Sequence, residues 1–95
     1  MPVVGCLSVE LHIPGARSLK DKRVVLRSLK DRLRALNVAV AESDEHAPLW
    51  QRAHLSIVAI ADEQQRVERS LEKVLEEVER KGAGVVVASE IEWLR

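Results

Sequence analysis

The apolar residues of this chain switch between two spacings, every second residue as in a strand and every third or fourth as in a helix. Residues 3–13 alternate, and Pro14 with Gly15 ends that strand because neither suits a strand interior. Residues 19–36 have a helical stripe of leucines, preceded by Ser18 as a helix N-cap. The start of the chain therefore predicts a strand followed by an amphipathic helix.

The rest of the chain repeats this alternation of strand and helix. Asn37 can close the first helix in a left-handed conformation, and Gly82 has the position of a stop for the second. The expected elements are a short strand at 38–42, a polar loop at 43–51, a strand at 52–61, a helix from Asp62 to about Lys81 and a last strand at 84–94.

This order of elements predicts an α+β fold of the ferredoxin-like type, the split βαβ arrangement β-α-β-β-α-β. Such a chain closes into a four-stranded antiparallel sheet with two helices on one face. The expected strand order is 4-1-3-2, which puts the strands at 3–13 and 52–61 in the centre. We expect residues 1–95 to form a single ferredoxin-like domain, because 95 residues fit one small core.

Aromatic residues are scarce, and Phe and Tyr do not occur, so the core must be built from Val, Leu, Ile and Ala. Cys6 is the single cysteine, which fits a reducing compartment. No apolar run is long enough to span a membrane and no cleavable leader is evident, so we expect a soluble, cytoplasmic protein. One Asn and three Gln among 32% charged residues lean toward a heat-adapted source.

Positive charge is sorted along this formally neutral chain. Residues 1–34 have eight Lys and Arg against three acidic residues, a balance of +5, and residues 35–95 have seven against twelve, a balance of −5. Five of the cations recur at helical spacing over about 21 Å of one helix face, which suits a row of phosphates. These five, called the basic stripe below, are Lys20, Arg23, Arg27, Lys30 and Arg34.

The turn before the first helix adds cations at the helix N-terminus, where free N–H groups and the helix dipole favour an anion. Lys22 falls by its angle within the apolar stripe, so it either reaches past the edge of the core or is aimed at a ligand. The candidate nucleic-acid-binding residues are Arg17, Lys20, Lys22, Arg23, Arg27, Lys30 and Arg34.

A salt-bridged face is the alternative interpretation of the basic stripe. The two helices lie side by side in the expected fold, so the stripe could meet the acidic side of the second helix, and Asp31 can partly neutralise Arg27 within the first. The acidic residues concerned are Glu68, Glu72, Glu76 and Glu79. The sequence leaves both interpretations open.

The helix-free face of the sheet is a second candidate surface. Its central strands have no aromatic side chain there, which argues against the base stacking of RNA-recognition motifs. Val86 is expected on this face, in a mixture of apolar and polar residues that favours a protein partner or a homo-oligomer; a small satellite core under a loop is the alternative. Trp50 is expected either to pack back against its loop or to be a binding hot spot. The candidate protein-interface residues are Val4, Ser8, Glu10, His12, Trp50, His54, Val58 and Ile60.

Catalytic and metal-binding sets are not indicated. Ser8, Glu10 and His12 share a strand face, but neighbours on one face lie about 7 Å apart, too far for a nucleophile and its base. The histidines lack the spacing of metal ligands, Cys6 has no partner cysteine, and no phosphate-binding glycine motif occurs. We expect no enzyme activity, metal, cofactor or small-molecule substrate.

Four segments of the chain are distinctive: Val9-Glu10-Leu11-His12, Pro14-Gly15-Ala16-Arg17-Ser18-Leu19-Lys20-Asp21-Lys22-Arg23, Asn37-Val38-Ala39-Val40-Ala41-Glu42 and Leu49-Trp50-Gln51-Arg52-Ala53. Together they resemble the YlxP-like family, a bacterial family of unknown function, over essentially the whole chain. The resemblance implies a ferredoxin-like fold. Genes of that family often lie near those for transcription-termination, translation-initiation and ribosome-maturation factors, which implies RNA-linked work by association. The site residues that it implies here are Arg17, Lys20, Lys22 and Arg23.

We therefore expect a non-enzymatic accessory protein that contacts structured RNA or the ribosome through the basic helix and its N-terminal turn. The alternative is a protein-interaction or self-assembling module that uses the helix-free sheet face and has no nucleic-acid role.

Overall fold

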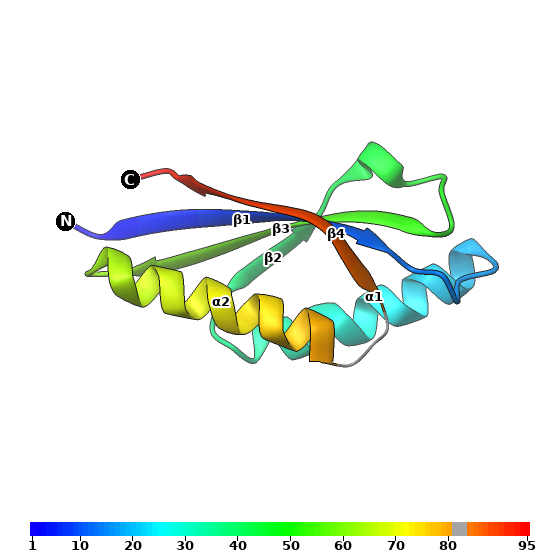
Figure 1. Cartoon of the computed structure of the whole chain (residues 1–95), viewed down its shortest axis with the longest axis horizontal. Coiled ribbons are helices and arrows are strands. Elements are labelled where there is room, and N and C mark those ends of the chain that lie inside the picture. The colour runs from blue at the N-terminus through cyan, green and yellow to red at the C-terminus, as the bar shows by residue number, and fades with distance from the viewer. Residues whose placement is uncertain (81–83) are drawn as a thin grey trace.

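The computed structural model describes residues 1–80 and 84–95 and confirms the predicted order of elements. The elements are β1 (Val3–His12), α1 (Leu19–Arg34), β2 (Ala39–Glu42), the short 3-10 helix η1 (Asp44–His46), β3 (Arg52–Ala61), α2 (Gln64–Arg80) and β4 (Val85–Trp93). The four strands form one antiparallel sheet in the predicted order, β2-β3-β1-β4, and both helices lie on one face of it (Figure 1). The expected helix stop at Lys81 and Gly82 lies outside the described residues.

The ends of α1 follow the local signals in the sequence. Ser18 has an extended backbone, and its hydroxyl accepts a hydrogen bond from the backbone N–H of Asp21 at 3.0 Å. The Asp21 carboxylate in turn accepts one from the backbone N–H of Arg17 at 3.0 Å. After the helix, Asn37 has a φ of 64°, the left-handed conformation that we expected. The hydrogen bonds of Ser18 and Asp21 fix where the turn before α1 lies relative to the helix.

The core lies between the sheet and the two helices, and its buried hydrophobic residues are all Ala, Val, Leu or Ile. β1 and β3 pair so that Leu7 lies opposite Ile57 and Val9 opposite Leu55, and each of these side chains is at most 1% exposed. The helices complete the core with the leucines and valines that face the sheet, namely Leu26, Leu29, Leu33, Val67, Leu71, Val74 and Val78.

β4 departs from the prediction at Val86. Glu10 of β1 pairs with Ala88, whereas Leu11 pairs with Val86, so Val87 has no opposite residue and the ladder shifts. One extra residue in a strand moves the side chains beyond it to the other face of the sheet. Val86 therefore packs against the core, and its predicted place on the helix-free face is wrong.

Gly5 lies at a close approach between β1 and α2. A Cβ atom at this position would lie 2.8 Å from Cγ1 of Val67 and 3.2 Å from Cζ3 of Trp93. We expect Gly5→Ala to lower the free energy of unfolding by about 1–3 kcal/mol, because an overpacked core forces its neighbours to shift. Urea unfolding measures the change. Gly15→Ala is the control, since nothing lies within 4 Å of its added Cβ, and equal losses in both variants would contradict the packing described.

Candidate nucleic-acid interface

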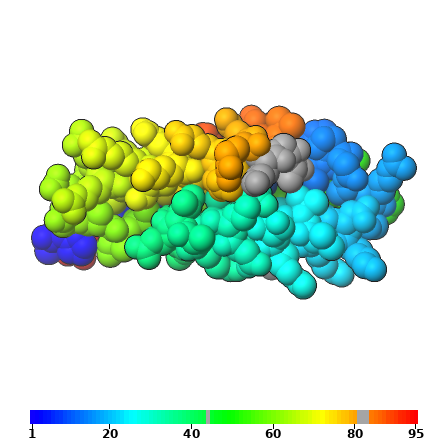
Figure 2. Space-filling view, turned by 90° about the horizontal axis from the view of Figure 1, so that it is seen from below, coloured from blue at the N-terminus to red at the C-terminus, as the bar shows by residue number. Residues whose placement is uncertain are grey.

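The two flanks of α1 have different neighbours. One flank faces α2, and Figure 2 shows the two helices side by side. Arg32 spans this contact, with its Nε atom 3.2 Å from Oε1 of Glu77. Arg80 donates to the same carboxylate at 3.0 Å, and this hydrogen bond, helped by the charges of Arg80 and Arg32, lowers the pKa of Glu77. The contact between the helices thus uses a cation outside the basic stripe.

The basic stripe lies on the opposite flank of α1, toward β2. Lys30 shows this placement, because its Nζ atom lies 3.2 Å from Oε1 of Glu42, the last residue of β2. Since α2 packs on the other flank, no stripe residue forms an ion pair with α2 in the described part of the chain. The alternative interpretation, in which the stripe pairs with Glu68, Glu72, Glu76 and Glu79, is therefore not borne out by the ion pairs of the described residues.

Three of the five stripe cations, Lys20, Arg23 and Arg27, have no acidic partner among the side chains that the structure describes, those of residues 1–43, 45–80 and 84–95, and all three are exposed. We expected Asp31 to neutralise Arg27, but it pairs with Arg34, with Nη1 and Oδ1 3.5 Å apart. That pair is open to solvent, where an ion pair is worth little and leaves the arginine able to exchange partners. The positive charge of the stripe is thus largely available to an external anion.

The stripe borders a surface hollow of about 400 Å³ beside β2. Four cations and two carboxylates line it, so its wall has a net positive charge. The lining residues are Arg23, Leu26, Arg27, Lys30, Asp31, Arg34 and Glu42. An anionic chain that follows α1 would lie along this hollow.

Lys22 has a different role from the one that we predicted. Its side chain is 3% exposed, and its Nζ atom donates hydrogen bonds to the carbonyl oxygens of His46 and Leu49, each at 2.8 Å. A buried ammonium that donates to two carbonyl groups is not available to a phosphate. Lys22 is therefore wrong as a nucleic-acid ligand; it ties the loop before β3 to the first turn of α1.

Gln51 holds the other end of that loop. Its Nε2 atom donates to the carbonyl oxygens of Pro14 and Ala16 at 3.2 and 3.1 Å, and its own carbonyl accepts from the backbone N–H of Ile13 at 2.8 Å. The exposed Arg17 follows directly on this turn. The loop, the turn and the start of α1 thus form one connected surface. The sequence had indicated only the turn as an addition to the basic helix.

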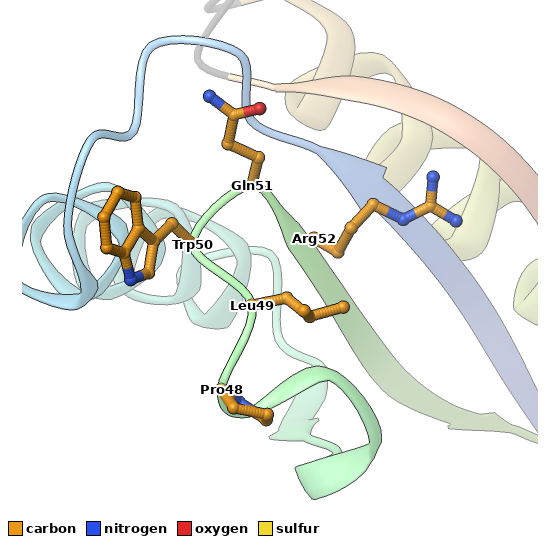
Figure 3. Close-up of a pocket in the computed structure, with 5 residues that line it drawn as sticks. All are labelled: Pro48, Leu49, Trp50, Gln51 and Arg52. Carbon is orange, nitrogen blue, oxygen red and sulfur yellow. The ribbon is translucent and has the colours of Figure 1, made fainter.

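Trp50 lies between these two anchors. Its side chain is 52% exposed and that of Leu49 is 48% exposed, so neither packs into the core. Figure 3 shows the indole beside the turn that leads into α1. With three neighbours, Trp50 and Leu49 line a second hollow, of about 420 Å³; the lining residues are Pro48, Leu49, Trp50, Gln51 and Arg52.

The helix-free face of the sheet has an apolar end and a polar end. At the apolar end Val4 lies opposite Ile60, and Val58 lies one pair further along β3. At the polar end Glu10 lies opposite His54, whose Nδ1 atom is buried without a hydrogen-bond partner in the described residues. The other predicted interface residues of this face, Ser8 and His12, alternate with the core positions of β1, whereas Trp50 lies apart in the loop.

Glu10 also receives a partner that the sequence did not reveal. Nε2 of His46, in η1, lies 2.9 Å from Oε2 of Glu10, and Nη2 of Arg52 lies 3.7 Å from the same oxygen. Donor atoms of Glu10, Glu45 and His46 all lie within 4.8 Å of one another, so these three residues could hold a metal ion. No spacing along the chain signals this group, because His46 is 36 positions from Glu10.

Two further features bear on function. Burial, with a smaller contribution from the Glu92 carboxylate, raises the pKa of the Cys6 thiol, which disfavours the reactive thiolate. Neither α1 nor α2, within the residues that the structure describes, is long and apolar enough to cross a membrane.

Comparison with known proteins gives a family and a fold. Residues 4–91 match the family described as "Protein of unknown function (DUF503)". The uncharacterized protein YlxP of Bacillus subtilis (strain 168) is 32% identical over 74 residues, which cover 77% of this chain and 79% of that protein.

Among solved structures, a C-terminal segment of the alpha subunit of aIF2 from Pyrococcus abyssi is 25% identical, with a TM-score of 0.54 over 99% of this chain. The chain spans 50% of the length of that segment. The de novo designed protein Foldit4 has a TM-score of 0.57, and the match covers 100% of this chain and 98% of Foldit4. Because its sequence is only 12% identical, this similarity concerns the fold alone. These similarities confirm the ferredoxin-like fold.

The contact made by Lys22 can be tested by removing its charge. We expect Lys22→Met to lower the free energy of unfolding by about 1–3 kcal/mol, because the His46 and Leu49 carbonyl groups lose their donor. Urea unfolding measures this loss, and the emission of Trp50 in a Trp93→Phe background reports whether the loop moves. Lys20→Met removes an exposed charge of the same helix and should change neither signal. Identical unfolding curves for the two variants would show that the loop does not depend on Lys22.

Proposed function

The chain belongs to the DUF503 family of proteins of unknown function, and we propose that it is an accessory protein that contacts the phosphate backbone of structured RNA, alone or in the ribosome. The observation that carries this proposal is the set of three exposed stripe cations without an acidic partner in the described residues, Lys20, Arg23 and Arg27. A helix that needed these charges for its own packing would have paired them, as it pairs Arg32 with Glu77.

The geometry of the stripe suits a backbone contact. Phosphates repeat along a nucleic acid without regard to sequence, and rows of Lys and Arg bind them largely by releasing counterions. Arg17 extends the row past the start of α1, where the helix dipole also favours a phosphate. The residues proposed to hold phosphates are Arg17, Lys20, Arg23, Arg27, Lys30 and Arg34.

The similarity to a segment of an aIF2 subunit adds a modest argument. That segment belongs to one subunit of a larger assembly, and its 25% identity to this chain extends over nearly the whole fold. A role as a small accessory protein that docks on a larger particle fits both the similarity and the three stripe cations without an acidic partner among the described side chains.

A protein-interaction module is the second candidate, and the apolar end of the helix-free face favours it. Ile60 is 66% exposed there, opposite Val4, and Val58 next to it lies opposite Ala39 of β2. A second copy of this chain that covered this end would bury these apolar side chains, which favours association. This candidate needs neither the basic stripe nor a nucleic acid.

The RNA proposal predicts a specific change in salt dependence. Replacing Lys20, Arg23 and Arg27 together by Gln should reduce the slope of log affinity against log salt by about 2–3, since each lost phosphate contact contributes about 0.7 on single strands and 0.9 on duplexes. Binding of the purified protein to ribosomal subunits and to total RNA over a salt series measures this slope.

The matched control replaces Arg66, Arg69 and Lys73 of α2 by Gln, which removes the same charge from exposed positions outside the stripe. Its slope should stay near that of the wild type. If both triple variants lose the same slope, or if the wild type binds no RNA at low salt, the stripe is not a phosphate site.

The second candidate predicts a dimer in solution. The mass from light scattering should be twice that of one chain, and Ile60→Lys should return it to one chain, because an ammonium would have to be buried in the apolar contact. Val24→Lys, at a 63% exposed position of α1, is the control and should keep the dimer. A monomeric wild type at high concentration would exclude this form of self-association.

A further inference from the structure

Trp50 is the feature of the surface that the phosphate contact does not explain. The core is filled by Ala, Val, Leu and Ile, and this indole remains 52% exposed next to Leu49, which is 48% exposed. The two side chains line a hollow of about 420 Å³ with Pro48, Gln51 and Arg52. The hollow has a flat aromatic wall and one cation.

The loop holds this indole in place instead of leaving it on a flexible segment. The chain is fixed just before Trp50, where Leu49 accepts from the buried Lys22, and just after it, where Gln51 bonds to Pro14, Ala16 and Ile13. With both neighbours of Trp50 anchored, the backbone that carries the indole is in place before any ligand arrives. Such preorganisation lowers the entropic cost of binding.

The same anchors place Trp50 at one end of the basic stripe. Lys22 belongs to the first turn of α1, between Lys20 and Arg23, so the loop that it holds lies where the stripe begins. Arg52 adds a positive charge in the hollow, with Glu10 3.7 Å from its guanidinium as the nearest acidic partner given by the structure. A fixed aromatic face beside a row of cations is the combination that binds single-stranded nucleic acids.

We propose that Trp50 stacks on an unpaired base of the bound RNA while the phosphates next to that base contact the start of the basic stripe. The inference rests on the proposed function and specifies its substrate: an RNA with a loop, bulge or single-stranded end, not a continuous duplex. Stacking tolerates every base, because each has a π face, so the site selects unpaired structure more than sequence. A protein partner that uses Trp50 as a hot spot is the competing explanation.

The test uses the full chain with Trp93→Phe, so that Trp50 is the single tryptophan. The probes are a single-stranded oligoadenylate and a blunt RNA duplex of the same length, both at low salt. Stacking should quench the emission of Trp50 with the single strand and not with the duplex. In the wild-type background, Trp50→Ala should weaken binding of the single strand by about 5- to 150-fold, leave the duplex nearly unchanged and preserve the salt slope.

Two variants keep the test independent of folding. Trp50→Phe should retain most of the single-strand affinity, since a phenyl ring still stacks. Leu94→Ala truncates a 55% exposed side chain whose backbone pairs with Val4, at the opposite end of β1 from the loop, and should change nothing. Binding that depends on the stripe but not on Trp50 would overturn this inference and leave the proposed function standing. Equal losses for single strand and duplex would also overturn it, since the loop would then act through the fold. If the wild type binds neither the single strand nor the duplex, both this inference and the proposed function are contradicted.

Discussion

The pairing of β1 with β3 is the constraint on which the rest of the structure depends. Their shared apolar face, with Leu7, Val9, Leu55 and Ile57 almost fully excluded from water, must be covered, and two helices cover it. Because the two helices lie side by side on one face of the sheet, each contacts the other along one flank only. For α1 that flank contains Arg32, and the basic stripe is turned the other way. The availability of the stripe thus follows from how the sheet is covered.

Lys22 connects this core to the surface. Burying an ammonium is unfavourable unless its donors are satisfied, and the two carbonyl groups of the loop satisfy them with charge-assisted hydrogen bonds. The consequence is that the polar loop before β3 is held against the first turn of α1. Lys22, whose charge suggested a ligand contact, instead holds the loop that carries the exposed Trp50.

Most of the fold could be predicted from the sequence, and the failures share one cause. The Ser18 cap and the left-handed Asn37 were predicted and are confirmed, because each depends on neighbouring residues. The strand order is also confirmed, because the order of strands and helices along the chain leaves few ways to close the sheet. Val86 was wrong because a bulge shifts a strand by one residue without a clear local signal. The roles of Lys22 and of the ion pairs between the helices could not be predicted, because the partners lie 24 or more positions away along the chain. The sequence pattern does not specify how the elements that contain those partners are placed side by side.

By itself, the sequence determined which apolar residues of the two central strands and of the helices face the core, where α1 begins and ends, and that five cations share a helix face, because periodicity and capping are properties of neighbouring residues. The tertiary structure alone decided which of those cations are neutralised, that Lys22 is buried and that the loop around Trp50 joins the start of α1. These outcomes depend on side chains from distant segments meeting across a packed layer, where geometry, and not composition, selects the partner.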